Sequence, residues 1–380
     1  MSAAGNLAGM ATGVSVVNSS AAVSDLPPAA SVRKAGNERW VALDALRGIA
    51  AVWVAWYHFY RFSPLPDVLR LSKWPRWFLL HGYLGIEIFF VLSGVVISLS
   101  IMDERISAPY ALSFAVRRSI RLDPPYWITL ALACVIRTAV GTPPPPSSVV
   151  AHIFYLQNVL GIPNIVPQFW TLCYEIQFYL VLILLVGCAQ KGGKFVGWLA
   201  AVAPLAASLV LVTLGRTDPG WFLNYWYAFA LGVGTTAVIR KRISPATWAI
   251  FTGLVLLLGF VLGRVEVICV AVTSFVIGFA GLAGKLGRWS GGPVFQYLGR
   301  ISYSLYLLHF VGTAFARIAA VRADSVWEGF LVFVIATLIA IGCAELLYRF
   351  VESPAHKLSR RLGPPVASYL LRSMQPAARG

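Results

Sequence analysis

Charged residues are scarce in this chain of 380 residues, and acidic ones are the scarcest. Only 12% of the residues are Asp, Glu, Lys or Arg, whereas 58% are hydrophobic, and the mean hydropathy is +0.74. Soluble domains carry about twice that charged fraction because their surface faces water. The composition therefore excludes an ordinary soluble protein and predicts one that lies in a lipid bilayer.

Cysteine is also sparse, and its placement argues against two common kinds of site. The five cysteines are an odd number, and each lies inside an apolar stretch. Their spacing is not that of metal ligands, and a disulfide framework needs pairs. We interpret them as small hydrophobic side chains and expect no metal site.

Long apolar stretches, by contrast, are numerous. Ten segments are long enough to cross a bilayer as helices: about 42–60, 82–101, 124–141, 168–188, 195–214, 221–239, 246–262, 266–284, 298–316 and 327–350. We therefore predict an all-α, polytopic membrane protein with one domain over 40–352, a bundle of about ten transmembrane helices. Residues 1–39 are expected to form a disordered tail and 353–380 a basic tail. The shorter apolar stretch 150–162 is expected to be interfacial or re-entrant.

The distribution of positive charge predicts the orientation. The net charge is +16, and of the 31 Lys and Arg residues 21 fall on the side of both termini and nine on the other, with Arg47 inside the first segment. Because cytosolic loops carry an excess of Lys and Arg, both termini are predicted to be cytosolic, with the protein in the cell (inner) membrane. The basic residues lie in short loops, so a nucleic-acid partner is not expected.

The first segment contains two residues that are unusual in an apolar helix. Arg47 and His58 are eleven positions apart, which places them on nearly the same helix face and about 16 Å apart along the axis. An arginine inside the bilayer costs a few kcal/mol, so it marks either a function or a buried partner, for which Asp44 is one turn away. His58 is either a titratable base near the outer surface or an interfacial histidine that only packs.

Two carboxylates are predicted at the same outer depth as His58. Glu87 begins the second apolar segment, and Glu175 lies two turns into the fourth. A carboxylate that accepts a proton from one imidazole nitrogen raises the basicity of the other, which is the arrangement that activates a hydroxyl. The structural alternative is that each glutamate only satisfies a polar group of a neighbouring helix.

Three arginines precede the third apolar segment. Arg117, Arg118 and Arg121 are related by three or four positions, so on a helix they form one cluster of guanidinium groups. Such groups bind phosphate through forked, charge-assisted hydrogen bonds. The alternative is that they only anchor the cytosolic end of the helix.

Taken in order, five sequence motifs resemble those of the membrane acyltransferase family 3. The resemblance runs from about Leu43 to Lys357, and Glu87 stands where Asp is frequent in that family. The motifs are Leu43–Ala50 with His58, Phe89–Gly94, Arg117–Arg121, Phe169–Leu172 with Glu175 and Phe178–Tyr179, and Leu298–His309.

The resemblance implies a membrane enzyme that moves an acyl group, usually acetyl, from cytosolic acyl-CoA to a hydroxyl. The acceptor is expected to be a cell-surface or secreted glycan or a small molecule. Arg47 with the three clustered arginines Arg117, Arg118 and Arg121 would bind the CoA phosphates. His58 would be the general base or a covalent acyl carrier, with Glu87 and Glu175 as its catalytic partners. Three further residues are expected to contact the substrate: Trp170, Tyr174 and His309.

Two other functions remain open on the sequence. A transporter of a glycan or lipid-linked intermediate would also line its path with charged residues, although transporters usually show internal repeats, and we find none. A non-catalytic assembly subunit would tolerate the loss of His58. No motif in the outer loops identifies the acceptor.

Overall fold

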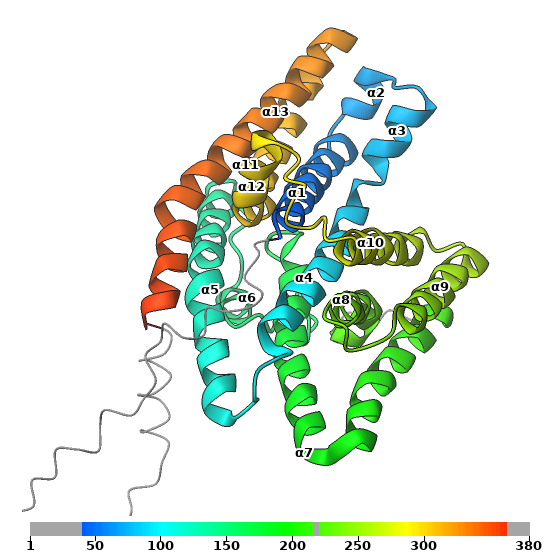
Figure 1. Ribbon diagram of the computed structural model, residues 1–380. Helices are drawn as coiled ribbons and strands as arrows, with labels where there is room; N and C mark the ends of the chain where they lie inside the picture. Colours follow the sequence, from blue (N-terminus) through cyan, green and yellow to red (C-terminus); the bar gives the residue numbers. More distant parts are fainter. Residues whose placement is uncertain (1–39, 216–219, 363–380) are drawn as a thin grey trace, which may run out of the picture. The chain divides into compact units, whose positions relative to one another are not determined.

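The computed structural model describes residues 40–215 and 220–362, so the predicted tail 1–39 and most of 353–380 lie outside the described residues. Across the described part every regular element is a helix and none is a strand (Figure 1). The predicted all-α fold class is therefore confirmed.

Most helices follow the predicted apolar segments. The longer ones are α1 (Val41–Arg61), α4 (Gly85–Ile101), α5 (Ala108–Ala139), α7 (Phe169–Thr213), α8 (Trp226–Ile239), α9 (Pro245–Leu262), α10 (Val265–Leu282), α12 (Ser302–Ala319) and α13 (Val326–Leu347). The shorter ones are α2 (Leu65–Leu69), α3 (Lys73–Leu80), α6 (Pro146–Ile153) and α11 (Pro293–Arg300). Within the described ranges six helices are long and apolar enough to cross a membrane, so the protein is multi-pass, but the predicted count of ten is not confirmed.

The helix α5 differs from its prediction. The sequence suggested a helix that starts at Pro124, whereas α5 begins at Ala108 and continues through Pro124 and Pro125. Each proline removes one backbone donor, and neighbouring groups can compensate inside a membrane protein. Next to the prolines, the Tyr303 hydroxyl of α12 donates to the Leu122 carbonyl at 2.9 Å, which joins α5 to α12. The arginine cluster consequently lies inside the helix and not before it.

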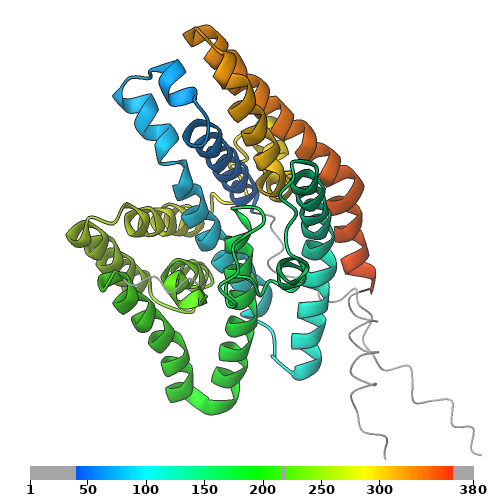
Figure 2. The same cartoon turned by 180° about the vertical axis from the view of Figure 1, so that it is seen from behind.

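A sharp bend divides α7 into two arms, which form a V in Figures 1 and 2. The bend is at Gly193, whose φ of 75° and ψ of −170° are not helical. Only glycine adopts a positive φ without steric strain, so the residue type permits the turn. The two arms correspond to the two predicted segments 168–188 and 195–214.

The last helix extends past its predicted end. It runs from Val326 to Leu362 and contains a π-helical turn, η4 (Tyr348–Glu352). Its start is fixed by a capping box, in which Ser325 accepts from the backbone of Glu328 and the Glu328 side chain accepts from that of Ser325. The predicted boundary between membrane domain and tail, after 352, thus falls within one continuous helix.

The bundle centre depends on close helix contacts. α1 packs against α4, α11 and α12, and α12 packs against α13. α4 also packs on α8, where Gly94 and Gly232 face each other's backbone. A Cβ atom at either position would collide with a carbonyl oxygen, of Phe229 or Val91. Only glycine therefore lets α4 and α8 approach this closely.

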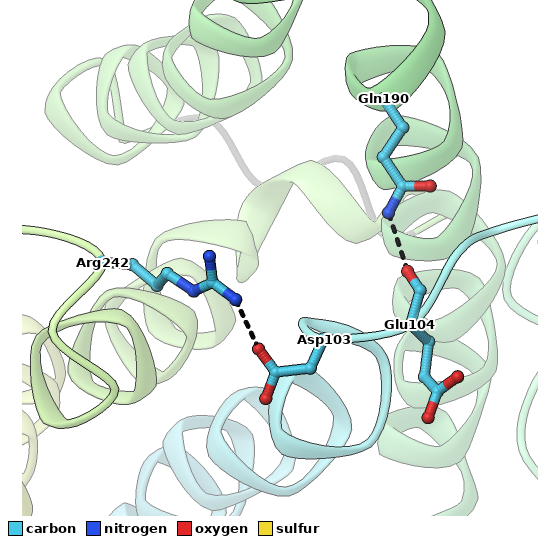
Figure 3. Close-up of polar contacts among 4 residues, drawn as sticks. All are labelled: Asp103, Glu104, Gln190 and Arg242. Atoms are coloured by element: carbon cyan, nitrogen blue, oxygen red, sulfur yellow. Dashed lines mark hydrogen bonds and ion pairs between the residues drawn. The ribbon is translucent and has the colours of Figure 1, made fainter.

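One end of the bundle is tied together by polar contacts between loops (Figure 3). Arg242, after α8, forms an ion pair with Asp103, after α4, at 2.6 Å. Gln190 of α7 donates to the Glu104 carbonyl at 2.8 Å. These contacts join three segments that the charge distribution places on the same side of the membrane.

Candidate functional site

A polar pocket lies inside the apolar bundle and is lined by α1, α4, α5, α7 and α12. We call it the arginine pocket. Its polar lining residues are Arg47, Ser93, Arg118, Arg121, Thr171, Glu175, Tyr179, Tyr303 and Tyr306. Three guanidinium groups from two helices meet here: the fold brings Arg47 together with Arg118 and Arg121, whereas Arg117 does not line this pocket. Such a pocket favours an anionic ligand.

Glu175 is a counter-charge within the arginine pocket. Its Oε1 accepts from the Ser93 hydroxyl at 2.9 Å and also from the Tyr179 hydroxyl. Arg118 lies 4.7 Å above the Tyr179 ring and within electrostatic reach of Glu175. These contacts orient the carboxylate and the guanidinium together, so the pocket is pre-formed.

A second group of cations adjoins the first. We call it the Arg360 pocket, lined by Arg117, Arg118, Arg121, His356 and Arg360, among others. Arg118 and Arg121 line both pockets, so the two share a wall. The sequence predicted Arg360 only as part of a basic tail, because nothing in the local sequence indicates that the end of the last helix lies against α5.

Glu352, at the end of the π-helical turn, is another residue near these arginines that the sequence did not predict. It is 8% exposed, accepts from the Ser304 hydroxyl at 2.6 Å, and lies within electrostatic reach of Arg47 and Arg121. Single π-helical turns often occur at functional sites because they redirect one side chain.

His58, near the end of α1, and His309, near the middle of α12, form a pair. Their ring centroids are 4.6 Å apart. Each Nδ1 lies against a backbone carbonyl: that of Val54 at 2.9 Å for His58, and that of Tyr306 at 2.8 Å for His309. A carbonyl only accepts, so both Nδ1 atoms carry the proton and both Nε2 atoms keep a lone pair. The pair is thus prepared to accept a proton.

One face of α12 links the histidine pair to the arginine pocket. Tyr303, Tyr306 and His309 follow at spacings of three, so they lie along one stripe of the helix. Tyr303 and Tyr306 line the arginine pocket, and the Tyr306 ring lies 5.8 Å from the His309 ring. Arg47 and His58 consequently both lie on the side of α1 that faces α12.

The expected pairing of His58 with a carboxylate is not what the structure contains. Among the described residues no carboxylate hydrogen-bonds to His58, because Glu175 faces the arginines and Glu87 faces α8 and α10. Glu87 and Trp170 line a separate cavity, the Glu87 pocket, which also includes Tyr83, Tyr225, Arg264 and Glu266. Tyr174 is buried and packs edge-on against Trp170. The substrate contacts expected of Trp170, Tyr174 and His309 stay predictions.

No metal-ligand group of three His, Cys, Asp or Glu side chains occurs within residues 40–215 and 220–362. The expectation of no metal site stays a prediction. The residues suited to a charged substrate are the arginines described above.

The described part of the chain is a multi-pass helical membrane protein with an anion-suited pocket and a pair of histidines whose Nε2 atoms can accept a proton. Comparison with known families defines it further: the family model described as an acyltransferase domain matches residues 40–349. The chain belongs to this family, acyltransferase 3, and the resemblance carried by its motifs is confirmed.

Curated relatives bear names that fit this family. O-acetyltransferase OatA of Staphylococcus aureus (strain NCTC 8325 / PS 47) is 26% identical over 364 residues, covering 83% of this chain and 57% of the relative. Peptidoglycan O-acetyltransferase OatA of Listeria monocytogenes is 24% identical over 365 residues, covering 83% and 56%. The chain spans somewhat more than half the length of these relatives. No solved structure matches it.

Proposed function

We propose that this protein is a membrane O-acyltransferase that transfers an acetyl or similar acyl group from cytosolic acyl-CoA to a hydroxyl of a cell-surface or secreted glycan. The observation that carries the proposal is the His58–His309 pair, whose free Nε2 atoms lie one side-chain layer beyond the arginine pocket. The family membership and the names of the relatives support the same reaction class.

The donor would bind through its phosphates. Arg117, Arg118, Arg121 and Arg360 offer guanidinium groups to the nucleotide diphosphate and 3′-phosphate at the Arg360 pocket. The pantetheine arm then follows the arginine pocket along α12 towards Tyr306. Glu175 and Glu352 hold the arginines in place without neutralising all of them.

The acyl transfer requires one base. The acceptor hydroxyl donates its proton to Nε2 of His58 while its oxygen attacks the thioester carbonyl carbon. The new C–O bond forms, the C–S bond breaks, and the proton is passed to the thiolate to give free CoA. The Val54 carbonyl holds the His58 ring in the required tautomer, and His309 accepts a hydrogen bond from the protonated ring.

The decisive experiment is acyl transfer by purified protein in nanodiscs. Labelled acetyl-CoA is supplied with cell-wall and exopolysaccharide fragments, and acetylated product is measured by mass spectrometry. We expect His58→Ala to lower the rate about 100-fold to 10,000-fold, the usual contribution of a general base. The matched control is His81→Ala, since the His81 ring stacks on Trp77 outside the site.

Two results would contradict the proposal. Unchanged transfer in His58→Ala would remove the base from the mechanism. Movement of a labelled glycan into proteoliposomes without any acetyl-CoA-dependent product would instead favour the transporter.

A further inference from the structure

The Glu87 pocket is distinct from the site described above. It is a cavity of about 200 Å³ between the start of α4, both arms of α7, the start of α8 and the start of α10. Two of its aromatic rings, Trp170 and Tyr225, lie 5.4 Å apart by centroid. Arg264 and Glu266 form an ion pair at its rim, at 3.7 Å. Aromatic faces and hydrogen-bonding groups thus line one cavity.

Glu87 is the unexplained group in this cavity. The residue is only 5% exposed, and its carboxyl group lies within hydrogen-bonding reach of Tyr227. Its Oε2, however, is buried without a hydrogen-bond partner among the described residues. A buried carboxylate oxygen that lacks a donor costs substantial free energy, so its presence indicates that a ligand supplies the donor. The oxygen would accept a hydrogen bond from an O–H or N–H group placed in the cavity.

The position of the cavity relates it to the reaction. Ile86 lines both this cavity and the arginine pocket, so a single layer of side chains separates the two. On the other side, the Tyr83 ring lies 5.7 Å from that of Tyr57, which lies 5.1 Å from that of His58. If the ligand held here is one unit of a polymer, the next unit of that polymer would lie beside the histidine pair.

The charge of the lining restricts the ligand. Among the described residues of the lining, the only guanidinium, that of Arg264, is already paired with Glu266, so this lining offers no unpaired cation to an acidic sugar. A neutral pyranose has C–H faces that pack on aromatic rings and hydroxyl groups that donate to carboxylates. We infer that the Glu87 pocket binds an uncharged sugar unit of the acceptor, an inference that rests on the proposed function.

Direct binding of defined sugars tests this inference. Isothermal titration with full-length protein in nanodiscs would use three probes: an N-acetylglucosamine tetramer, cellotetraose and tetragalacturonate. We expect at least one neutral tetramer to bind and the acidic one to bind at least tenfold more weakly. The substitutions Glu87→Gln and Trp170→Ala should each weaken sugar binding about tenfold or more, with acetyl-CoA binding unchanged.

Matched variants outside the pocket control for general damage. Glu104→Gln and Trp198→Ala alter exposed residues at other places and should leave sugar affinity unchanged. Equal affinity of wild type and Glu87→Gln, equal binding of tetragalacturonate, or no binding of either neutral tetramer would overturn the inference.

The two proposals fail in different ways. Sugar binding that depends on Glu87, in a protein that transfers no acetyl group, would refute the proposed reaction only. Transfer that depends on His58 while Glu87→Gln keeps the wild-type KM for the acceptor would refute the sugar site only.

Discussion

Two backbone carbonyls determine the chemistry of the histidine pair. By accepting from Nδ1 of His58 and of His309, the carbonyls of Val54 and Tyr306 leave both Nε2 atoms as acceptors. Neither ring can then donate to the other, and a proton delivered between them is shared. The pair therefore suits proton removal from a hydroxyl better than a lone interfacial histidine would.

If the proposed function is right, several arginines share the binding of the donor phosphates, and this predicts an effect for Arg360, which lies outside the family match. We expect Arg360→Ala to weaken acetyl-CoA binding about tenfold, because the loss of a charge-assisted hydrogen bond to phosphate costs about 1.5–3 kcal/mol. Titration with a non-hydrolysable acetyl-CoA analogue checks this. Arg118→Ala should weaken binding at least as strongly, since Arg118 lines both pockets.

The control is Arg137→Ala, at the far end of α5 from the pockets, where the side chain bonds only the Thr142 carbonyl. If Arg360→Ala and Arg118→Ala bind the analogue like wild type, these arginines only anchor the helix ends. That was the alternative interpretation of the cluster in the sequence.

The sequence predicted which side chains share one face of a helix, but not which side chains of different helices face each other. The spacing of Arg47 and His58 placed both on one side of α1. It did not reveal that Glu175 faces Arg118 or that Glu87 faces α8, because helical periodicity gives relative faces along one helix only. The orientation of one helix about its axis relative to another comes from packing.

Close contact between α4 and α8 positions the Phe89–Gly94 motif beside the arginine pocket. We expect Gly94→Ala to lower the free energy of unfolding by about 1–3 kcal/mol, because the new Cβ collides with the Phe229 carbonyl oxygen. Thermal unfolding in detergent, followed by intrinsic fluorescence, measures this. Gly253→Ala on α9 is the control, since its Cβ would meet open space. Equal melting temperatures for the two variants would contradict tight α4–α8 packing.

Helix boundaries were predictable where nearby residues set them and not where distant residues do. Some helix boundaries are set by neighbouring residues. Gly193 permits the bend of α7, and the capping box of Ser325 starts α13. The starts of the predicted segments 195–214 and 327–350 therefore lie close to the observed ones. The continuation of α5 through Pro124 was not predicted, because a pair of prolines usually marks the start or end of a helix. The contact of Tyr303 with α5 comes from far along the chain, and the sequence around the prolines gave no sign of it.

The loop contacts near Asp103 and the charge distribution together predict a topology. We expect Lys241→Cys, next to the Arg242–Asp103 ion pair, to react with an impermeant maleimide only after the cells are permeabilised. Lys73→Cys, at the start of α3, should react in intact cells. Both are compared in a background without the exposed Cys188. Labelling of Lys241→Cys in intact cells would reverse the orientation and place the arginines outside.

The membrane location, the helical fold class and the family follow from the sequence, because hydrophobic length and short motifs are local properties of a chain in a bilayer. Which residues come together in the site does not follow from the sequence. The histidine pair joins α1 to α12, the arginine pocket joins α1 to α5 and α7, and the Arg360 pocket joins α5 to the end of the last helix. Each of these depends on which helix faces meet. That choice is made by close packing across the bundle, where positions such as Gly94 set how near two helices come.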